Sequence, residues 1–287
     1  MKEKFLVIDA NSLIHRGYHA LPPLSNSKGQ PLNGVYGFFM IFLKAINIFK
    51  PKYVCACFDF PAKNFRHDDY ADYKAKRKKA PDDLYLQIPL VKDALKNMGI
   101  KIYEQQGFEA DDLIATAVVQ SQELQRIILS GDMDNAQLVK DDVQIYGWGK
   151  NIKDNVIYDS KRVFDHFKVN PEQVVDYKAL VGDASDNIPG GEGIGKKTAV
   201  ELLSKYKGVH EIFEQIESGN AWDMQEKMKA KLLATKDRIF LSYKLALTKT
   251  DVFKLDVSEC LWDSYDRNAA KQIFLEFEFK SLIDRLP

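Results

Sequence analysis

Cysteine is scarce in this chain, with 3 among 287 residues and no pairing pattern among them. Secreted disulfide scaffolds carry closely spaced pairs of cysteine, so the lack of such pairs favours a reducing, cytoplasmic setting. Cys55 and Cys57 alternate along a predicted strand and would face the same side of it. Because no second pair of Cys or His lies nearby, we interpret both as core residues and not as zinc ligands.

Long hydrophobic runs are also absent from the sequence. Near the amino terminus, only a four-residue apolar run precedes Asp9, so we expect no signal peptide. The longest apolar stretch, residues 35–49, is interrupted by Lys44 and Asn47 and is followed by Pro51. A membrane-spanning helix needs about 20 apolar residues, so we interpret this stretch as part of a buried helix and predict no membrane association.

The chain carries no net charge, because 41 Lys and Arg balance 41 Asp and Glu. This balance argues against a protein that binds polyanions through its overall charge alone. Nine acidic residues, however, fall in the motifs described below. Setting those nine aside leaves 32 acidic against 41 basic residues, an excess of nine positive charges over the rest of the chain.

Short apolar runs alternate with helical patterns over the first half of the chain. The runs predict strands over residues 4–8, 53–58, 100–103, 126–129 and 143–146. Helical patterns fill the connections, at residues 11–20, 34–49, 84–98 and from residue 110 onward. Strands that alternate with helices at this spacing predict a parallel α/β sheet with right-handed crossovers.

Strand signals fade after about residue 160, and a second, mostly helical region is predicted there. Its helices are expected over residues 159–167, 171–181, 196–206, 209–216 and 224–247. No clear linker separates the two regions, so we expect them to pack tightly. We predict an α/β domain over residues 1–170 and a helical domain over residues 171–287.

Acidic residues follow the ends of four predicted strands. They are Asp9 after the first strand, Asp59 after the second, Glu109, Asp111 and Asp112 after the third, and Asp132 and Asp134 after the fourth. In parallel α/β sheets, ligands bind at the carboxyl ends of the strands. A single acid at such a position is often a helix cap or a turn former. Four strands that each carry acid to the same edge instead predict a site for divalent metal ions.

Oxygen ligands without His or Cys favour hard cations, so we expect Mg²⁺, with Mn²⁺ as a substitute. Seven carboxylates exceed what one Mg²⁺ binds, so two ions are expected. Two such ions about 4 Å apart stabilise the attacking and leaving oxygens of a phosphodiester displacement. The acidic edge therefore predicts a phosphodiester substrate.

Residues 61–83 indicate the class of that substrate. Seven basic side chains are interleaved with three aromatic ones, namely Lys63, Phe65, Arg66, Tyr70, Tyr73, Lys74, Lys76, Arg77, Lys78 and Lys79. Basic groups bind phosphates, and rings stack on bases. Composition alone fits a solvated loop equally well, but the position directly after Asp59 favours nucleic-acid binding.

A glycine-rich stretch, residues 182–198, lies between two predicted helices. It approaches the P-loop pattern, but Lys197 replaces the required Ser or Thr and no strand precedes it, which excludes a P-loop NTPase. A glycine turn that leads into a helix amino terminus with two lysines suits the phosphate backbone of a duplex. The predicted DNA contacts are Gly193, Gly195, Lys196 and Lys197. Asp183 and Asp186 begin this turn, and we expect them to reach the metal site from the second region.

Six segments in this order resemble the 5′-nuclease (flap endonuclease) superfamily, and within it the 5′→3′ exonuclease domain of bacterial DNA polymerase I. They are FLVIDANS (5–12), CFDFPAKNFR (57–66), YKAKR (73–77), FEADDLI (108–114), SGDMDNAQL (130–138) and LVGDASDNIPGGEGIGKKTA (180–199). The likeness covers essentially the whole chain. Two positions depart from the family pattern: Met133 stands where relatives often carry Lys, and Gly191-Glu192 stands where Val-Pro is common.

The resemblance implies a PIN-like α/β domain with flanking helices and a helical arch at about residues 61–83, through which a 5′ single strand passes. It also implies a helix–turn–helix, of the helix-hairpin-helix type, that binds duplex DNA. The implied metal ligands are Asp9, Asp59, Glu109, Asp111, Asp112, Asp132, Asp134, Asp183 and Asp186. Lys74 and Arg77 stand at the positions of catalytic basic residues. The implied DNA contacts of the arch are Arg66, Tyr73 and Lys76. The glycine turn would hold a K⁺ ion against a DNA phosphate.

The leading hypothesis is a structure-specific 5′→3′ exonuclease and 5′-flap endonuclease that hydrolyses DNA by two-metal-ion catalysis in replication and repair. Its expected partner is DNA with a 5′ flap, nick or end, and we expect a monomer in the cytoplasm, associated with the nucleoid. One alternative is a catalytically weak DNA-junction-binding protein whose carboxylates hold metal to order the fold. Another is a Mg²⁺ phosphohydrolase of small phosphate esters, which would need neither the basic segment nor the glycine turn.

Overall fold

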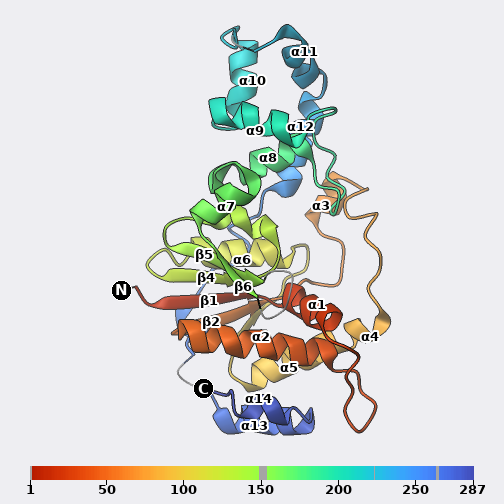
Figure 1. Ribbon diagram of the computed structural model, residues 1–287, viewed down its shortest axis with the longest axis vertical. Helices are drawn as coiled ribbons and strands as arrows, with labels where there is room; N and C mark the ends of the chain where they lie inside the picture. The colour runs from red at the N-terminus through yellow and green to blue at the C-terminus, as the bar shows by residue number, and fades with distance from the viewer. Residues whose placement is uncertain (1, 149–153, 223, 263–264) are drawn as a thin grey trace.

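Six strands of the described chain form one sheet at the centre of the first region (Figure 1). The computed structural model describes residues 2–148, 154–222, 224–262 and 265–287. The strands are β1 (Lys4–Asp9), β2 (Tyr53–Cys57), β3 (Lys101–Tyr103), β4 (Gln125–Leu129), β5 (Val143–Trp148) and β6 (Asn155–Tyr158). Their order across the sheet is β3-β2-β1-β4-β5-β6, so the first strand lies in the middle.

Strands β1 to β5 are parallel, as the alternation of strands and helices predicts. Strand β6 was not predicted, and it pairs antiparallel with β5, from Ile145 opposite Tyr158 to Trp148 opposite Asn155. The predicted parallel α/β sheet is confirmed for β1 to β5, and β6 adds one antiparallel strand at its edge. An antiparallel strand can follow its partner directly in the chain, so no crossover helix separates β6 from β5 and marks it in the sequence.

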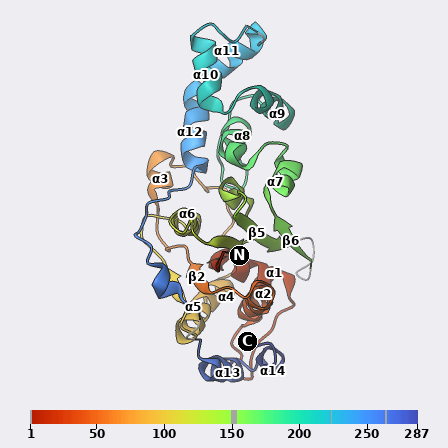
Figure 2. The same ribbon diagram turned by 90° about the vertical axis from the view of Figure 1, so that its left-hand side faces the viewer.

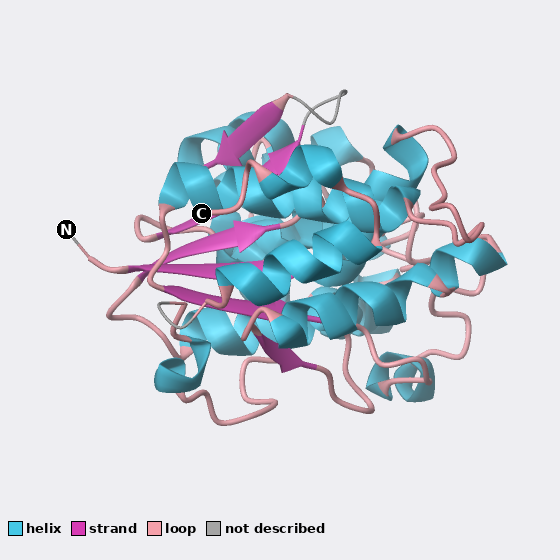
Figure 3. Ribbon diagram, turned by 90° about the horizontal axis from the view of Figure 1, so that it is seen from below, coloured by secondary structure: helices cyan, strands magenta, loops and turns pink. Residues whose placement is uncertain are grey.

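Helices cover both faces of the sheet, which makes its central strands apolar on both sides (Figure 3). The covering helices are α1 (Ala10–Ala20), α2 (Asn33–Phe49), α5 (Gln87–Asn97) and α6 (Ala110–Val119). In β1, Leu6 and Ile8 face the core shared with α1, α2 and α5. Phe5 and Val7 face the opposite core, shared with α6. All four side chains are fully buried, so β1 is an uninterrupted apolar run.

The predicted helical arch, residues 61–83, is helical in part. It contains α3 (Phe65–Asp69) and the start of α4 (Asp82–Tyr85), while residues 71–76 form turns. Lys74 lies in these turns with a φ of 56°, in the left-handed region that a regular helix does not use. The segment is therefore an irregular connection with short helices at its two ends.

The second region is helical, as predicted, and extends away from the sheet (Figure 2). Its elements are α7 (Ser160–Phe167), the 3-10 turn η2 (Pro171–Gln173), α8 (Val174–Val181), α9 (Lys196–Lys205), α10 (Val209–Glu217), α11 (Glu226–Ala234) and α12 (Lys236–Ala246). Helix α12 packs along α8 and leads the chain back toward the sheet. The single helix predicted over residues 224–247 is two helices, because Thr235 has a non-helical φ of −118°.

The carboxyl-terminal residues return to the α/β domain, which the sequence analysis did not predict. This segment contains the 3-10 turn η3 (Val257–Cys260), α13 (Arg267–Glu276) and α14 (Lys280–Ile283). Helices α13 and α14 lie below α2 and α5 in Figure 1. Phe274 packs edge-on against Phe39 of α2, with the ring centroids 5.1 Å apart. The helical domain therefore does not extend to residue 287 as expected, because α13 and α14 complete the core of the first domain.

Helices α1 and α2 approach each other closely through Gly17 and Gly37. A Cβ atom added at Gly37 would lie 2.3 Å from the Cα of Gly17, where two carbon atoms overlap. Helix α2 is buried along most of its length, which confirms the interpretation of residues 34–49. Among the helices that the structure describes, none is both long and apolar enough to cross a membrane.

We predict that Gly37→Ala destabilises the fold by about 1–3 kcal/mol, the range for overpacking a core. The clash is with backbone atoms, so no side-chain rotation relieves it. Gly195→Ala is the matched control, because no atom lies within 4 Å of the added Cβ and the φ of Gly195 is an ordinary −90°. Urea unfolding followed by circular dichroism measures both variants, and equal losses would contradict the close helix contact.

Candidate active site

Four acidic residues from different segments meet in one cavity at the carboxyl ends of β1, β2 and β4. The cavity has a volume of about 180 Å³, and its acidic lining is Asp9, Asp59, Asp111 and Asp132. Asp9 ends β1, Asp59 and Asp132 follow the ends of β2 and β4, and Asp111 lies in the first turn of α6. Because β1 lies between β2 and β4 in parallel register, the ends of these strands are adjacent.

Uncharged donors orient these four carboxylates. The bonds run from Ser12 N and Ser130 Oγ to Asp9, from Ala110 N to Asp59, from Asn135 Nδ2 to Asp111 and from Asp134 N to Asp132, at 2.6–3.0 Å. Asp9 is also the N-cap of α1, and Asp132 is the N-cap of the 3-10 turn η1 (Met133–Leu138). These bonds hold the carboxylates in place without neutralising their charges.

The negative charge in this acidic cavity is poorly compensated. Burial raises the pKa of Asp9 to about 7. Burial and the nearby charges of Asp132 and Asp9 raise the pKa of Asp111 well above its ordinary value. Burial also raises the pKa of Asp59. A bound cation would offset both the burial and the mutual repulsion, so the site is electrostatically suited to one.

The donors of the acidic cavity fit a hard divalent ion. Carboxylate oxygens are the ligands that Mg²⁺ prefers. Over the described ranges, no three His, Cys, Asp or Glu side chains lie close enough together to hold an ion by themselves. Mg²⁺ keeps several waters and binds through one or two carboxylates, so this spacing fits a partly hydrated ion. Asn11 and His15, which the sequence analysis did not select, also line the cavity.

Arg66 holds Asp112 away from the acidic cavity. Its guanidinium donates to both carboxylate oxygens of Asp112, at 2.7 and 2.8 Å, and lies 3.3 Å from Glu109. Arg66 is 2% exposed and Asp112 is 0% exposed, so this ion pair is internal. The placement corrects the expectation that Arg66 contacts DNA. Asp112, a predicted metal ligand, is therefore paired with Arg66 and does not line the acidic cavity.

Two more predicted ligands, Glu109 and Asp186, are held by basic residues of segment 61–83. Lys74 forms an ion pair with Glu109. The Nη2 atom of Arg77 lies 2.6 Å from an oxygen of Asp186, and the backbone N–H of Lys74 donates to the carbonyl of Asp186 at 2.9 Å. These bonds attach the segment to the first turn of α6 on one side and to the glycine turn on the other.

Tyr73 lies inside the same ion-pair network. Its hydroxyl donates to Glu109 at 3.0 Å and to Asp186 at 3.1 Å, and the residue is 3% exposed. A base cannot stack on a buried ring, so the structure corrects the expectation that Tyr73 contacts DNA. Lys74 and Arg77, the two predicted catalytic residues, line the acidic cavity together with the four carboxylates.

Lys178 of α8 joins the last two predicted ligands. Its ammonium group pairs with Asp134 and lies 2.8 Å from an oxygen of Asp183. The sequence analysis missed this residue. A lysine between Tyr177 and Ala179 in an apolar helix could have indicated an internal ion pair, because buried lysines are almost always paired. The nine predicted ligands thus divide into four in the acidic cavity, three held by Arg and Lys near segment 61–83, and two held by Lys178.

The glycine-rich turn leads from α8 to α9 and packs against α12. Gly182 and Gly190 have φ angles of 79° and 64°, a conformation that favours glycine. The N–H of Gly190 donates to the hydroxyl of Ser242 in α12 at 2.9 Å. Close backbone packing therefore explains the glycines at the start of the turn.

The predicted DNA contacts lie at the end of this turn. Gly195 is the N-cap of α9, and Lys196 and Lys197 follow in its exposed first turn. The carbonyl of Gly193 accepts a hydrogen bond from Lys231 at 3.1 Å. The two lysines are thus accessible at the positive end of a helix dipole, where anions bind favourably.

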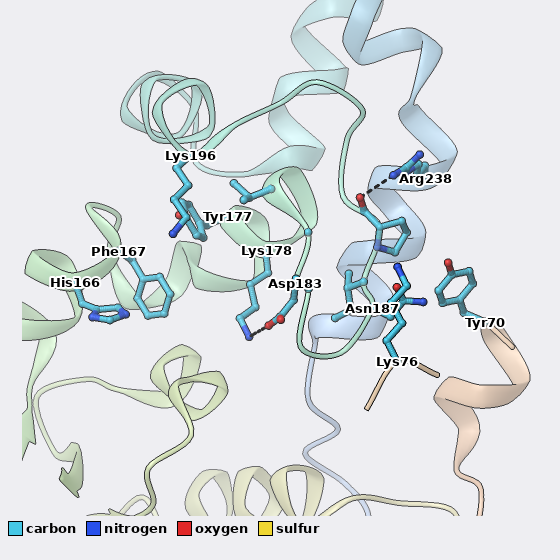
Figure 4. A pocket seen from close by; sticks show the side chains of 15 residues that line it. Tyr70, Lys76, His166, Phe167, Tyr177, Lys178, Asp183, Asn187, Lys196 and Arg238 are labelled. Atoms are coloured by element: carbon cyan, nitrogen blue, oxygen red, sulfur yellow. Dashed lines mark hydrogen bonds and ion pairs between the residues drawn. The ribbon is translucent and has the colours of Figure 1, made fainter. Parts of the chain in front are cut away.

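A second cavity of about 780 Å³, the basic cavity, lies beside the glycine turn (Figure 4). Its basic lining is Lys76, Lys178, Lys196 and Arg238, and its aromatic lining is Tyr70, His166, Phe167 and Tyr177. Two predicted DNA contacts, Lys76 from the irregular segment and Lys196 from α9, therefore share one concave surface. Basic groups suit phosphates, and among the rings of this lining His166 is exposed while Tyr177 is buried.

Two family models together match residues 4–268 of the chain. The 5′-3′ exonuclease N-terminal resolvase-like domain matches residues 4–168, and the 5′-3′ exonuclease C-terminal SAM fold matches residues 169–268. The chain belongs to the 5′-3′ exonuclease family. Its members are nucleases, so the chain is a hydrolase, and the resemblance inferred from the six sequence segments is confirmed.

Curated relatives agree with this family assignment. The 5′-3′ exonuclease of Aquifex aeolicus is 40% identical over 280 residues, which are 96% of this chain and 93% of the relative. DNA polymerase I of Bacillus subtilis is 36% identical over 288 residues, which are 99% of this chain and 32% of the polymerase. The chain thus spans about a third of the length of the polymerases that it matches.

Solved structures share the fold of this family member. A T5 5′-exonuclease with bound zinc has a TM-score of 0.69 at 22% identity, covering 96% of this chain and 99% of that one. The catalytic core of Rad2 in complex with DNA substrate has a TM-score of 0.61 at 15% identity, covering 99% and 92%. At these identities the likeness shows the fold, a PIN-like α/β domain followed by a helical region.

We predict that Arg66→Met destabilises the protein by about 3–5 kcal/mol, because it leaves the buried Asp112 carboxylate without a positive charge, with only backbone N–H donors from Glu109 and Lys249. Arg77→Met is the matched control: its side chain is 50% exposed and its partner Asp186 keeps a hydrogen bond from Tyr73, so we expect a smaller loss than for Arg66→Met. Urea unfolding measures both losses. Similar losses in the two variants would contradict the internal role of Arg66.

Proposed function

We propose that this nuclease hydrolyses DNA phosphodiesters at 5′ ends and at the base of 5′ flaps, using two divalent ions, with Mg²⁺ as the natural ion. One observation carries the proposal. Four carboxylates from different segments line a single cavity together with two basic side chains, namely Asp9, Asp59, Asp111, Asp132, Lys74 and Arg77. Acidic groups for cations and basic groups for phosphate oxygens around one space fit phosphodiester cleavage.

The acidic residues fall into three proposed roles. The first ion would lie among Asp9, Asp59, Asp111 and Asp132, bound directly by one or two of these carboxylates and through its waters by the others. The ligands of the second ion are Asp134 and Asp183. The carboxylates that orient the basic side chains around the site are Glu109, Asp112 and Asp186. When bound, the ions lower the pKa of a coordinated water and stabilise the charge of the leaving oxygen.

Lys74 and Arg77 are the proposed catalytic residues. Their charged groups pair with Glu109 and Asp186 at the wall of the acidic cavity. A DNA phosphate in the cavity offers anionic oxygens to the same two cations. Lys74 and Arg77 would then stabilise the charge that develops on the phosphate, as fixed donors do in other active sites.

We also propose that α8, the glycine turn and α9 act as a helix–turn–helix on the backbone of duplex DNA. Lys196 and Lys197 support this because they are exposed at the amino terminus of α9. Lys76 lines the same basic cavity as Lys196 and would contact a neighbouring phosphate. The backbone of the glycine turn, with Gly193 and Gly195, is proposed to hold a K⁺ ion against a phosphate.

The proposed partner is DNA with a 5′ flap, nick or end. One chain contains every residue of the proposed site, so we propose that a monomer is sufficient for activity. The proposed setting is the nucleoid in the cytoplasm, where removal of primers and flaps belongs to replication and repair.

A duplex with a labelled 5′ flap tests the proposal. We expect release of the flap with Mg²⁺, no release with EDTA, and a rate lowered about 100-fold or more by Asp111→Asn or Lys74→Ala, the order of loss when a fixed electrostatic group is removed from an active site. Lys271→Ala, an exposed change on α13, is the control and should cleave at the wild-type rate. Flap binding without turnover in any divalent ion would favour the alternative, a catalytically weak DNA-junction-binding protein.

We predict that Lys196→Ala and Lys197→Ala each weaken duplex binding in proportion to the charge removed. The slope of log K against log salt concentration should fall by about 0.9 for each lysine, because each phosphate contact releases a counterion. Lys271→Ala again serves as the control and should keep the wild-type slope. Fluorescence anisotropy across a salt series measures the slopes, and wild-type slopes in both variants would exclude these contacts.

A further inference from the structure

Lys178 lies between carboxylates that come from the two different domains. Asp134 belongs to η1, directly after the sheet, and Asp183 belongs to the glycine turn of the helical region. The ammonium group pairs with both, and the side chain is 8% exposed. Lys178 therefore places one buried ammonium group between two carboxylates of different domains.

The acidic cavity is different in this respect. Asp9, Asp59, Asp111 and Asp132 accept their hydrogen bonds from backbone N–H groups, a hydroxyl and an amide. Over the described residues none of these four carboxylates forms an ion pair, although Lys74 and Arg77 line the cavity, whereas Asp134 and Asp183 are both paired with Lys178. A metal ion can therefore bind in the acidic cavity without breaking an ion pair, whereas at Asp134 and Asp183 it must displace Lys178.

Lys178 also has space into which it can move. It lines the basic cavity of about 780 Å³ together with Asp183, as Figure 4 shows. A lysine side chain has four rotatable bonds, so its ammonium can leave the two carboxylates while the backbone of α8 stays in place. Water and anions in the basic cavity would solvate the released group.

We propose that Lys178 is a positioning residue that neutralises Asp134 and Asp183 in place of the second divalent ion, so that this ion binds after the lysine releases them. The inference rests on the proposed two-ion function and adds an order of binding to it. The first ion binds at the acidic cavity, where it breaks no ion pair of the carboxylates. The second binds weakly to the DNA-free protein, because it must displace a buried ion pair.

Mn²⁺ binding to the DNA-free protein, measured by isothermal titration calorimetry, tests the proposal. We expect wild type to bind one Mn²⁺ tightly and a second weakly. Lys178→Met keeps the length of the side chain and removes its charge, so the second Kd should fall at least tenfold while the first is unchanged. Lys178→Arg keeps the charge and should bind as wild type does.

Lys196→Met is the matched control, because Lys196 lines the same basic cavity and its loss should change neither Kd. A second Kd in Lys178→Met that is unchanged or higher would overturn the proposal. Thermal unfolding checks that each variant is folded before titration.

Chemical labelling of the wild-type protein gives a test that needs no variant. Reductive methylation with mass-spectrometric readout should modify Lys178 slowly without metal, because its ammonium is buried and paired. With Mn²⁺ at a concentration that fills both sites, the labelling rate should rise at least tenfold, while the rate at exposed Lys271 stays constant. A rate at Lys178 that Mn²⁺ leaves unchanged would also overturn the proposal.

These tests separate the inference from the function on which it rests. If wild type binds no Mn²⁺ and cleaves no flap, the proposed function fails. If wild type binds two Mn²⁺ and cleaves the flap, but Lys178→Met does not tighten the second site, the inference about Lys178 fails alone.

Discussion

Repulsion between buried carboxylates is the constraint on which this structure depends. The topology carries acidic side chains from four strand ends to one edge of the sheet, and burial raises the pKa of Asp9 and Asp111. Crowded carboxylates are stabilised when they pair with basic side chains or bind a cation. The protein pairs five of the nine predicted ligands with its own basic side chains, and over the described residues the other four form no ion pair.

The pairing also holds the molecule together. Arg66, Lys74 and Arg77 attach the irregular segment to α6 and to the glycine turn, and Lys178 attaches the helical region to the end of the sheet. These contacts between distant segments are ionic, unlike the apolar contacts of α13 and α14 with the first domain. An apolar interface responds little to a charged ligand, whereas ion pairs exchange partners with phosphates and metal ions. The parts expected to meet DNA are therefore attached in part by bonds that DNA can replace, beside apolar clusters such as that of Tyr73, Val175, Ile188 and Leu245.

The sequence by itself determined the α/β class, the helical second region and the positions of the acids. Strand and helix periods are local, and parallel strands place their carboxyl ends at one edge, so the acids after β1, β2 and β4 could be assigned to one site. The motifs of the sequence also indicated the family. Local patterns are reliable here because each of them lies within about 20 residues of the chain.

The tertiary structure decided which partner each charge has. Asp112 faces Arg66, 46 residues away, and Asp134 faces Lys178, 44 residues away. Periodicity carries no information about such pairs, so Arg66 and Tyr73 were expected at the surface and Lys178 was not selected. The antiparallel strand β6, the break at Thr235 and the return of α13 to α2 have the same cause. Each depends on what a segment packs against, and that is set by contacts between residues far apart in the chain.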